Sequence, residues 1–233
     1  MIISVEEYIR EDSSSPYKSW FDGLDAQAAA KVTTAKLRME LGNTSSIKWF
    51  DGMGEYVIDW GPGYRIYLAK DGDALIVLFG GGTKRGQQRD IDRAKVLLAE
   101  YKIQKKALML KKTRRQQKSK WTERMRSMAL TRSFKETVLA RVHRDAAFAQ
   151  ALLDEAATLF LNGEPETARL ILRDLVNATI GFEQLSKLTA KPSKSLHRML
   201  SPSGNPSMDN LAAIFHAIRA RLNVKLEAHC VAV

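Results

Sequence analysis

A run of lysine and arginine near the middle of the chain constrains what it can fold into more than any other feature. Residues 102–126 hold eleven basic side chains against one acid, Glu123, and so carry nearly all of the formal net charge of +11. Blocks of like charge are usually solvated tails or connectors. The run therefore divides the 233 residues into two nearly neutral stretches of about 100 residues, a size at which a domain closes its own core.

This basic run leaves two interpretations open. It can be a solvated helical linker, which we place at residues 107–127, between domains at 1–106 and 128–233. It can also be an arm that contacts phosphates, because each neutralised phosphate releases counterions and gives salt-dependent affinity. In both cases the net charge and a pI near 9.8 indicate a polyanionic partner.

The cysteine content and the amino terminus bear on the compartment. Cys230 is the single cysteine, so no intramolecular disulfide forms and a reducing compartment is expected. Glu6 and Glu7 leave no room for the basic and apolar regions of a secretory signal, and no uninterrupted apolar stretch is long enough for a bilayer. We expect a cytoplasmic protein without a membrane partner.

The first domain begins with the pattern of one strand and two helices. Residues 2–9 favour a strand, and Ser15-Pro16 supplies an N-cap followed by proline at the first helical position. Asp25 is placed to cap a longer helix, which Gly42 is placed to end. We expect both helices to pack against one sheet.

The sheet itself is predicted from three apolar runs at residues 56–60, 64–69 and 74–79. The turn sequences Gly61-Pro62-Gly63 and Asp71-Gly72 separate them and predict an antiparallel meander, because each turn needs a positive backbone φ. After Gly80-Gly81-Gly82 the chain is expected to turn helical. The first domain is therefore predicted as α+β, in the order β-α-α-β-β-β-α.

Three short motifs of this domain resemble the RelE/HigB-type toxins, phage-related branch, of bacterial type II toxin–antitoxin modules. They are the stretch from Trp60 to Tyr67, the Gly-Gly-x-Lys-x-x-Gln stretch from Gly81 to Gln87, and Asp90-Ile91-x-x-Ala94. The resemblance covers about residues 1–106. It implies a small basic protein that enters the ribosomal decoding site and cuts messenger RNA without metal, whereas other branches poison gyrase.

The resemblance also suggests which side chains act on RNA. Arg65 resembles the strand arginine that holds the scissile phosphate, and Lys84 or Arg85 resembles the basic residue after the glycines. All four histidines lie beyond this domain, which excludes a histidine-pair mechanism and a His/Cys metal site. Fixed cations would then stabilise the transition state when a ribose 2′-hydroxyl attacks the phosphorus. We expect no metal and no cofactor.

Two tyrosines of the predicted strand are further candidates for the catalytic site. Tyr64 and Tyr67 lie on opposite sides of the strand, so at most one faces the site. That aromatic ring could stack on a base. The strand before the Gly-Pro-Gly turn reads Glu55-Tyr56-Val57-Ile58-Asp59 and lacks the extra basic residues of many ribonuclease members. This difference leaves open that the activity is weak, altered in target or lost.

From Leu130 onward the pattern is helical throughout, and the second domain is predicted as all-α. Two predicted helices, at residues 181–188 and 193–200, are separated by Thr189-Ala190-Lys191-Pro192. Their lengths and the short connecting turn are those of a helix-turn-helix. Ser193 is predicted to cap the second helix, whose apolar anchors are Leu196, Met199 and Leu200. The predicted DNA-contacting residues are Lys191, Ser193, Lys194, Ser195, His197 and Arg198.

Residues 128–233 resemble the Xre-type, HigA-like antitoxins that are encoded beside such toxins. The matching stretches are Phe134-Lys135-Glu136-Thr137, residues 177–182, and residues 200–205 with Pro206. The resemblance implies operator binding with autorepression, and sequestration of the toxin. The alternative for this half is a helical bundle that uses the helix-turn-helix geometry only for packing.

Together the two halves predict a toxin–antitoxin fusion. Its amino half would be a ribosome-dependent, metal-independent mRNA interferase (endoribonuclease), and its carboxyl half would neutralise that activity in cis or in a dimer and bind operator DNA. Because operators are usually palindromic, we expect a homodimer with recognition helices about 34 Å apart. Two alternatives remain: a DNA-binding transcriptional regulator with a degenerate toxin-like domain, and a gyrase-inhibiting toxin held by its antitoxin.

Overall fold

The chain forms two compact units, and each takes residues from both sides of the basic run. The computed structural model describes residues 3–73, 75–115 and 130–227. One unit, here the sheet unit, comprises Met1–Gly23 and Asn43–Phe134; the other, the helical unit, comprises Leu24–Gly42 and Lys135–Val233. Their limits differ from the sequence boundaries at 106 and 128, because residues 24–42 join the helical unit and residues 130–134 join the sheet unit.

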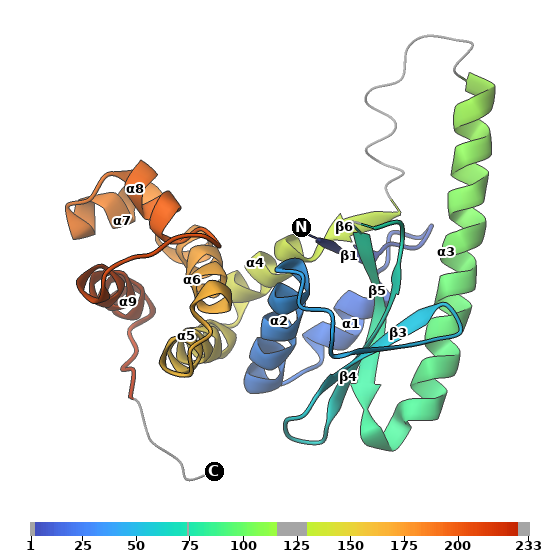
Figure 1. Cartoon of the computed structure of the whole chain (residues 1–233), viewed down its shortest axis with the longest axis horizontal. Helices are drawn as coiled ribbons and strands as arrows, with labels where there is room; N and C mark the ends of the chain where they lie inside the picture. Colours follow the sequence, from blue (N-terminus) through green and yellow to red (C-terminus); the bar gives the residue numbers. More distant parts are fainter. Residues whose placement is uncertain (1–2, 74, 116–129, 228–233) are drawn as a thin grey trace. The chain divides into compact units, whose positions relative to one another are not determined.

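The sheet unit is built on a six-stranded sheet in the order β2-β3-β4-β5-β1-β6 (Figure 1). Its strands are β1 (Ser4–Tyr8), β2 (Ile47–Phe50), β3 (Met53–Ile58), β4 (Tyr64–Lys70), β5 (Leu75–Thr83) and β6 (Thr131–Ser133). Strand β1 runs parallel to β5, and the other pairs are antiparallel. The predicted meander is confirmed as β3-β4-β5, and Gly63 and Gly72 both have a φ of 72° in its turns.

The sequence missed two strands of this sheet. Strand β2 was not expected, nor was β6, which falls where the sequence predicted helix only. Gly80–Gly82 lie inside β5, and the chain turns helical after them as predicted, first in a 3-10 turn at Lys84–Gly86 and then in a long helix from Gln87. These glycines serve close packing: a Cβ on Gly81 would lie 2.4 Å from the Trp20 ring, and a Cβ on Gly82 would lie 2.0 Å from Asp90 Oδ2.

Two helices and a short 3-10 turn complete the sheet unit. They are α1 (Pro16–Asp22), η1 (Lys84–Gly86) and α3 (Gln87–Arg115). The predicted cap of α1 is confirmed, since Lys18 N donates to Ser15 Oγ at 3.1 Å. Helix α3 continues into the basic run as far as Arg115, and the rest of the predicted linker lies outside the described residues.

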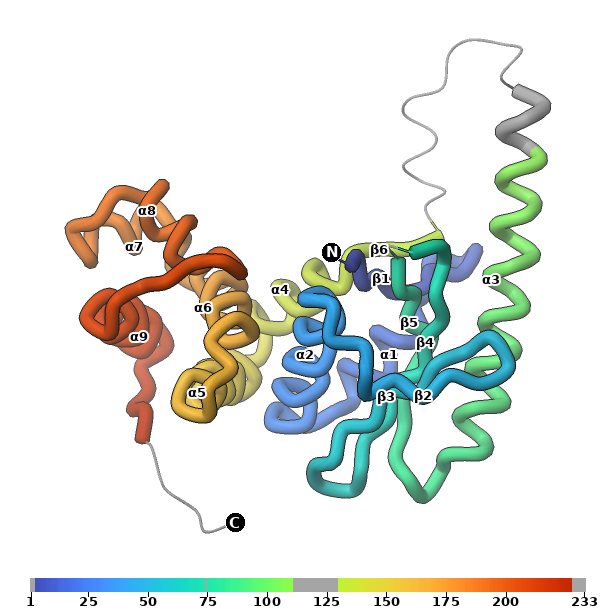
Figure 2. The backbone as a smooth tube through the Cα atoms, in the orientation of Figure 1, coloured from blue at the N-terminus to red at the C-terminus, as the bar shows by residue number. Residues whose placement is uncertain are grey.

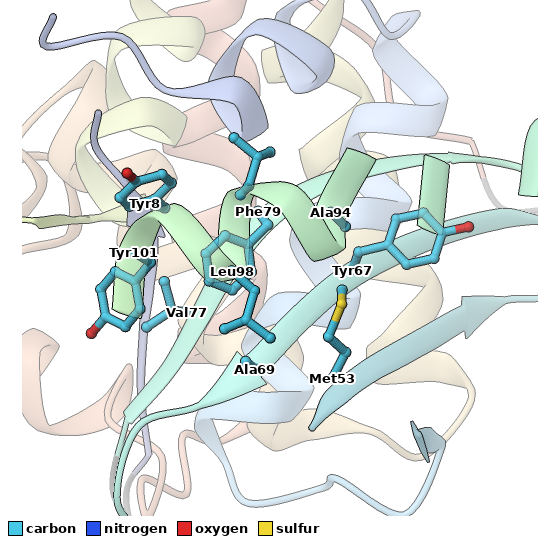
Figure 3. Close-up of a cluster of buried hydrophobic side chains, with 10 residues drawn as sticks. Tyr8, Met53, Tyr67, Ala69, Val77, Phe79, Ala94, Leu98 and Tyr101 are labelled. Atoms are coloured by element: carbon cyan, nitrogen blue, oxygen red, sulfur yellow. The ribbon is translucent and has the colours of Figure 1, made fainter. Parts of the chain in front are cut away.

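The core of the sheet unit lies between the sheet and α3 (Figure 3). It is rich in aromatic rings: Tyr101 meets Tyr8 edge-on at 5.6 Å and Phe79 at 5.9 Å between centroids. The hydroxyls of Tyr67 and Tyr101 lie at opposite ends of the cluster (Figure 3). Polar groups on the strand ends and on α3 accept from these phenols, so the sheet and α3 are joined by hydrogen bonds as well as by apolar burial.

The helical unit contains seven helices among the described residues. They are α2 (Ala26–Glu40), α4 (Phe134–Arg144, whose first residue belongs to the sheet unit), α5 (Ala146–Leu161), α6 (Pro165–Thr179), α7 (Phe182–Thr189), α8 (Ser193–Met199) and α9 (Met208–Leu222). Asp25 caps α2 as predicted, through a 2.8 Å bond from Ala28 N. The chain is therefore mixed α/β, with a six-stranded sheet followed by a helical region.

Helix α2 overturns one expectation about packing. The sequence predicted α2 on the sheet beside α1, whereas it packs against α5 and α6 of the helical unit (Figure 2). Ten of its fifteen residues are buried, among them the polar residues Thr33, Thr34 and Lys36. Burial on more than one face requires neighbours on more than one side, and α5 and α6 are two of them.

Across residues 3–73, 75–115 and 130–227, every helix falls short of the combination of length and apolar character that a bilayer crossing requires. Cys230 and His229 lie outside the described residues.

Candidate functional site

A groove of about 1000 Å³ follows an open edge of the central strand of the sheet unit. Strand β1 pairs only with residues 75–78 of β5, so among the described strands the end of β5 at Phe79–Thr83 has a partner, β4, on one side only. The groove is lined there by Gly80–Gly82. Backbone groups on an unpaired strand edge are available to another chain or ligand.

Four arginines line this groove. Arg85, Arg89 and Arg93 recur every fourth residue through η1 and the start of α3, and Arg10 follows β1. Four residues of helix rise about 6 Å, so the three side chains form a row. Within the described part of the chain, Arg85 and Arg93 have no side-chain partner. The groove is therefore cationic.

Two carboxylates partly neutralise this positive charge. Arg10 is held by Glu100 through two bonds of 3.0 and 3.1 Å, and both side chains remain partly exposed. Asp90 is the carboxylate among the lining residues, 3.9 Å from Arg89, which is 87% exposed. The unpaired cations outnumber this acid, so the groove favours an anionic ligand.

Arg65, the strand arginine predicted to hold a phosphate, is buried and interacts with other groups of the protein. It is 9% exposed, its Nη1 donates to Gly63 O at 2.6 Å, and its Nε lies 3.1 Å from Glu55 Oε1. This Nε is at ion-pair distance, although its N–H lacks a well-aligned acceptor in the described structure. Gln87 Nε2 donates to the same Glu55 oxygen at 2.8 Å. Arg65 therefore ties β4 to β3 and lies outside the groove lining.

The other predicted catalytic residues are spread over different positions. Arg85 and Tyr67 line the groove, whereas the exposed Lys84 does not. Tyr64 stacks on Trp60, with centroids 6.2 Å apart. Burial, with Glu55 next, raises the pKa of Tyr67, so its phenol keeps its proton near neutral pH and does not act there as a base. The structure thus brings together Arg85 and Tyr67 of the five candidates.

Sequence reasoning missed several lining residues. The four-residue spacing of Arg85, Arg89 and Arg93 was readable as one helix face. Arg10 and Trp20 gave no comparable signal, because only the folded sheet brings them to the edge of β5.

A second basic surface lies on the helical unit at α7 and α8. The connecting turn places Ala190 in the left-handed region with a φ of 52°, and Ser186 Oγ donates to Lys191 O at 2.5 Å. The residue that caps α8 is Pro192 and not Ser193, and no side-chain cap bond forms. The predicted cap is therefore wrong by one residue, because Pro192 already has the extended backbone of a capping position.

The exposed face of α8 carries three of the predicted DNA-contacting residues. Lys194, His197 and Arg198 are exposed, while Leu196 and Leu200 are buried. His197 stacks on Phe182 at 3.7 Å between centroids, which fixes its ring against α7. The remaining predicted contacts, Lys191, Ser193 and Ser195, are partly exposed. Lys191, Lys194 and Arg198 have no side-chain partner within the described residues, so their charges are available to a ligand.

A buried arginine holds the loop that follows α8 through hydrogen bonds. Arg169, 5% exposed, donates to Ser201 O at 3.0 Å and to Pro202 O at 2.5 Å. A Cβ on Gly204 would lie 2.2 Å from Met199 O, so the loop closes tightly over the end of α8.

Among the described residues there is no group of three or more His, Cys, Asp or Glu side chains that could hold a metal ion.

The fold and these surfaces define a mixed α/β protein with a basic groove on its sheet unit and a basic helix pair on its helical unit. In sequence comparisons, 86 residues of this chain are 40% identical to an uncharacterized protein of Haemophilus influenzae, strain KW20/Rd. The chain belongs to the same family as that protein. The match covers 36% of this chain and 87% of the relative, which is therefore less than half as long. No protein-family profile and no solved structure matches the chain.

Proposed function

We propose that the chain is a fused toxin–antitoxin protein. Its sheet unit is a RelE/HigB-like, ribosome-dependent endoribonuclease, and its helical unit binds operator DNA as an autorepressor and neutralises the toxin. The observation that carries this proposal is the row of exposed arginines beside the open, glycine-lined edge of β5. A relative less than half as long as this chain supports the view that one part of the chain also occurs as a separate protein.

Chemically, the groove suits an extended single strand of RNA. Backbone groups of Gly80–Gly82 and the guanidiniums of Arg85 and Arg93 would hold consecutive phosphates. A ribose 2′-hydroxyl then gives its proton to water while its oxygen attacks the adjacent phosphorus, the bond to the 5′-oxygen breaks, and that oxygen takes a proton from water. The products are a 2′,3′-cyclic phosphate and a 5′-hydroxyl. Fixed guanidiniums stabilise the additional negative charge of the transition state.

In this proposal Arg65 positions other groups and does not touch RNA. Its pairing with Glu55 fixes β3 and β4, and Gln87 extends the contact to the start of α3, where the arginine row begins. The same pairing favours a second candidate function: a DNA-binding transcriptional regulator whose sheet unit no longer cleaves RNA.

On the helical unit, α7 and α8 would act as a helix-turn-helix. Lys194, His197 and Arg198 lie on the exposed face of the second helix, as readers of the major groove require. Lys191 in the turn would contact a phosphate. A dimer would bind two half-sites one helical turn of DNA apart.

The first test is RNA binding by the full chain. A fluorescent single-stranded RNA is titrated with the protein, with the Arg85→Ala/Arg93→Ala variant, and with Lys48→Ala, a matched control because Lys48 is exposed on β2 outside the groove. We expect the double variant to weaken binding about tenfold and to flatten the salt dependence. Equal affinity of all three proteins would remove the groove from RNA binding.

The second test is toxicity of residues 1–134, which include the last residue of the sheet unit, produced alone in cells, with circular dichroism of the purified fragment to verify folding. Growth arrest with cleaved messenger RNA, relieved by Arg85→Ala/Arg93→Ala, supports the nuclease. Arrest with intact messenger RNA indicates a gyrase-type toxin. A folded fragment that leaves growth unchanged supports the regulator.

A further inference from the structure

Two segments of the chain pack with the half to which they do not belong in sequence. Helix α2 precedes the basic run but packs against α5 and α6 in the helical unit. Strand β6 follows the basic run but forms the edge of the sheet beside β1 (Figures 1 and 2). Each unit is therefore completed by a piece from the other side of the run.

Strand β6 satisfies a buried carboxylate of the sheet unit. Glu7 on β1 has no exposed surface, and its carboxylate accepts from Ser15 Oγ at 2.9 Å and from Arg132 Nε at 2.6 Å. Arg132 is the register partner of Glu7 across the two strands. A buried carboxylate without its cation is strongly destabilising, so residues 1–115 need β6 for this position.

The residue after β6 adds an apolar contact at the same place. Phe134 is fully buried, and its ring meets Tyr17 at 5.3 Å and Phe21 at 5.1 Å, in both cases edge-on. Residues 130–134 thus supply a strand, a cation and an aromatic ring to the sheet unit.

Helix α2 does the same for the helical unit. The fork of Arg38 donates to both oxygens of Glu164, at 2.8 and 2.7 Å. Glu155 on α5 is 7% exposed and is contacted by Lys31 Nζ at 2.7 Å and by Thr34 Oγ1 at 3.2 Å. Without α2, the buried Glu155 loses both contacts. The carboxyl-terminal part therefore needs α2 as the sheet needs β6.

We propose that these two contact sets form an interface that holds residues 1–115 and 130–227 together without the segment that connects them. The partner that this surface fits is the carboxyl-terminal part as a separate chain. The regulatory meaning rests on the proposed function: because residues 130–134 complete the sheet unit, cutting the basic run leaves the toxin bound to the carboxyl-terminal part. The two parts then associate through these contacts. The high effective concentration that a short tether provides strengthens the association but does not cause it.

The experiment cuts the full chain in solution. A protease recognition sequence is inserted within residues 116–129, the purified protein is cut to completion, and its mass is measured by size-exclusion chromatography with light scattering, also at high salt. We expect one species with the mass of both parts. Separate elution of two folded parts overturns the proposal. This readout needs no toxin activity, so it succeeds or fails independently of RNA cleavage.

Charge reversal tests the contacts themselves. In the cut protein, Lys31→Glu/Arg38→Glu should weaken association at least about tenfold, because like charges then face Glu155 and Glu164. Adding Glu164→Arg to Arg38→Glu alone should restore most of the affinity lost by Arg38→Glu. Lys48→Glu, exposed on β2, is the control and should have no effect. Unchanged association in the Lys31→Glu/Arg38→Glu protein would remove α2 from the interface.

Discussion

The sheet unit and the helical unit both present unpaired cations, but on surfaces of opposite curvature. In the sheet unit, Arg85 and Arg93 line a groove beside a glycine-rich strand edge. In the helical unit, Lys194 and Arg198 stand on the exposed face of α8. A groove with backbone groups suits a single strand, whereas a helix face suits the major groove of a duplex. Under the proposed function, these two sets of cations would meet two different nucleic-acid geometries.

The two units also differ in how they are stabilised. The sheet unit contains all six tyrosines of the chain and, among the described residues, Trp20, Trp49 and Trp60, and it buries Glu7 and Glu55 beside arginines. The core of the helical unit is mainly aliphatic, with leucine, isoleucine and alanine on α5 and α6. The helical unit buries charged side chains too, such as Glu155 and Arg169, so the two cores differ mainly in their aromatic content. The buried ion pairs of the sheet unit are positions that single substitutions can weaken.

The largest effect is expected from Arg132→Ala. It leaves Glu7 buried without its cation and should lower the free energy of unfolding of the sheet unit by about 3 kcal/mol. Tryptophan fluorescence during urea unfolding reports this unit, because the helical unit has no tryptophan. Adding Glu7→Gln should recover part of the loss. An unchanged urea midpoint for Arg132→Ala would contradict the role given to β6.

A somewhat smaller effect is expected from Gly81→Ala. The new Cβ would lie 2.4 Å from the Trp20 ring, a rigid neighbour, and overpacking of this kind typically costs about 1–3 kcal/mol. Gly80→Ala is the matched control in the same strand, since nothing lies within 4 Å of its Cβ position. Urea unfolding should separate the two variants; equal stabilities would show that Trp20 does not rest on β5.

A crossed binding experiment should sharpen the comparison of the two surfaces. Arg85→Ala/Arg93→Ala should weaken binding of single-stranded RNA about tenfold and leave duplex DNA from the gene's own upstream region unaffected. Lys194→Ala/Arg198→Ala should do the reverse. Arg221→Ala, exposed on α9, is the control for the helical unit. If both double variants weaken both ligands equally, the chain has one non-specific basic surface.

The smallest effect is expected at alkaline pH and only in the sheet unit. Burial raises the pKa of Tyr8, Tyr17, Tyr67 and Tyr101, whereas in the unfolded chain these phenols ionise near pH 10. Above that pH the unfolded state has lost protons that the folded state keeps, so stability falls as pH rises. Tyrosinate absorbance should then rise together with unfolding of the sheet unit. Ionisation of these phenols without unfolding would contradict their burial.

Much of the fold was predictable where the chain's own pattern decides local structure. The turn glycines Gly63 and Gly72, the caps Ser15 and Asp25, and the helical spacing of the second half act over a few residues. Strand β6 was missed because three residues carry no periodicity of their own and pair only through Glu7 and its neighbours on β1. The groove was half predicted: Arg85 was named, but Arg10 and Trp20 reach the edge of β5 only through the fold.

The sequence by itself determined the two-part layout, the hairpins of the sheet, and the positions of the basic residues, because these follow from composition and short-range backbone preferences. The tertiary structure alone decided that α2 packs with α5 and α6, that β6 closes the edge of β1, and that Arg65 faces Glu55. The physical reason is that an apolar or charged face specifies what kind of neighbour it needs, whereas which segment supplies that neighbour depends on the packing of the whole chain.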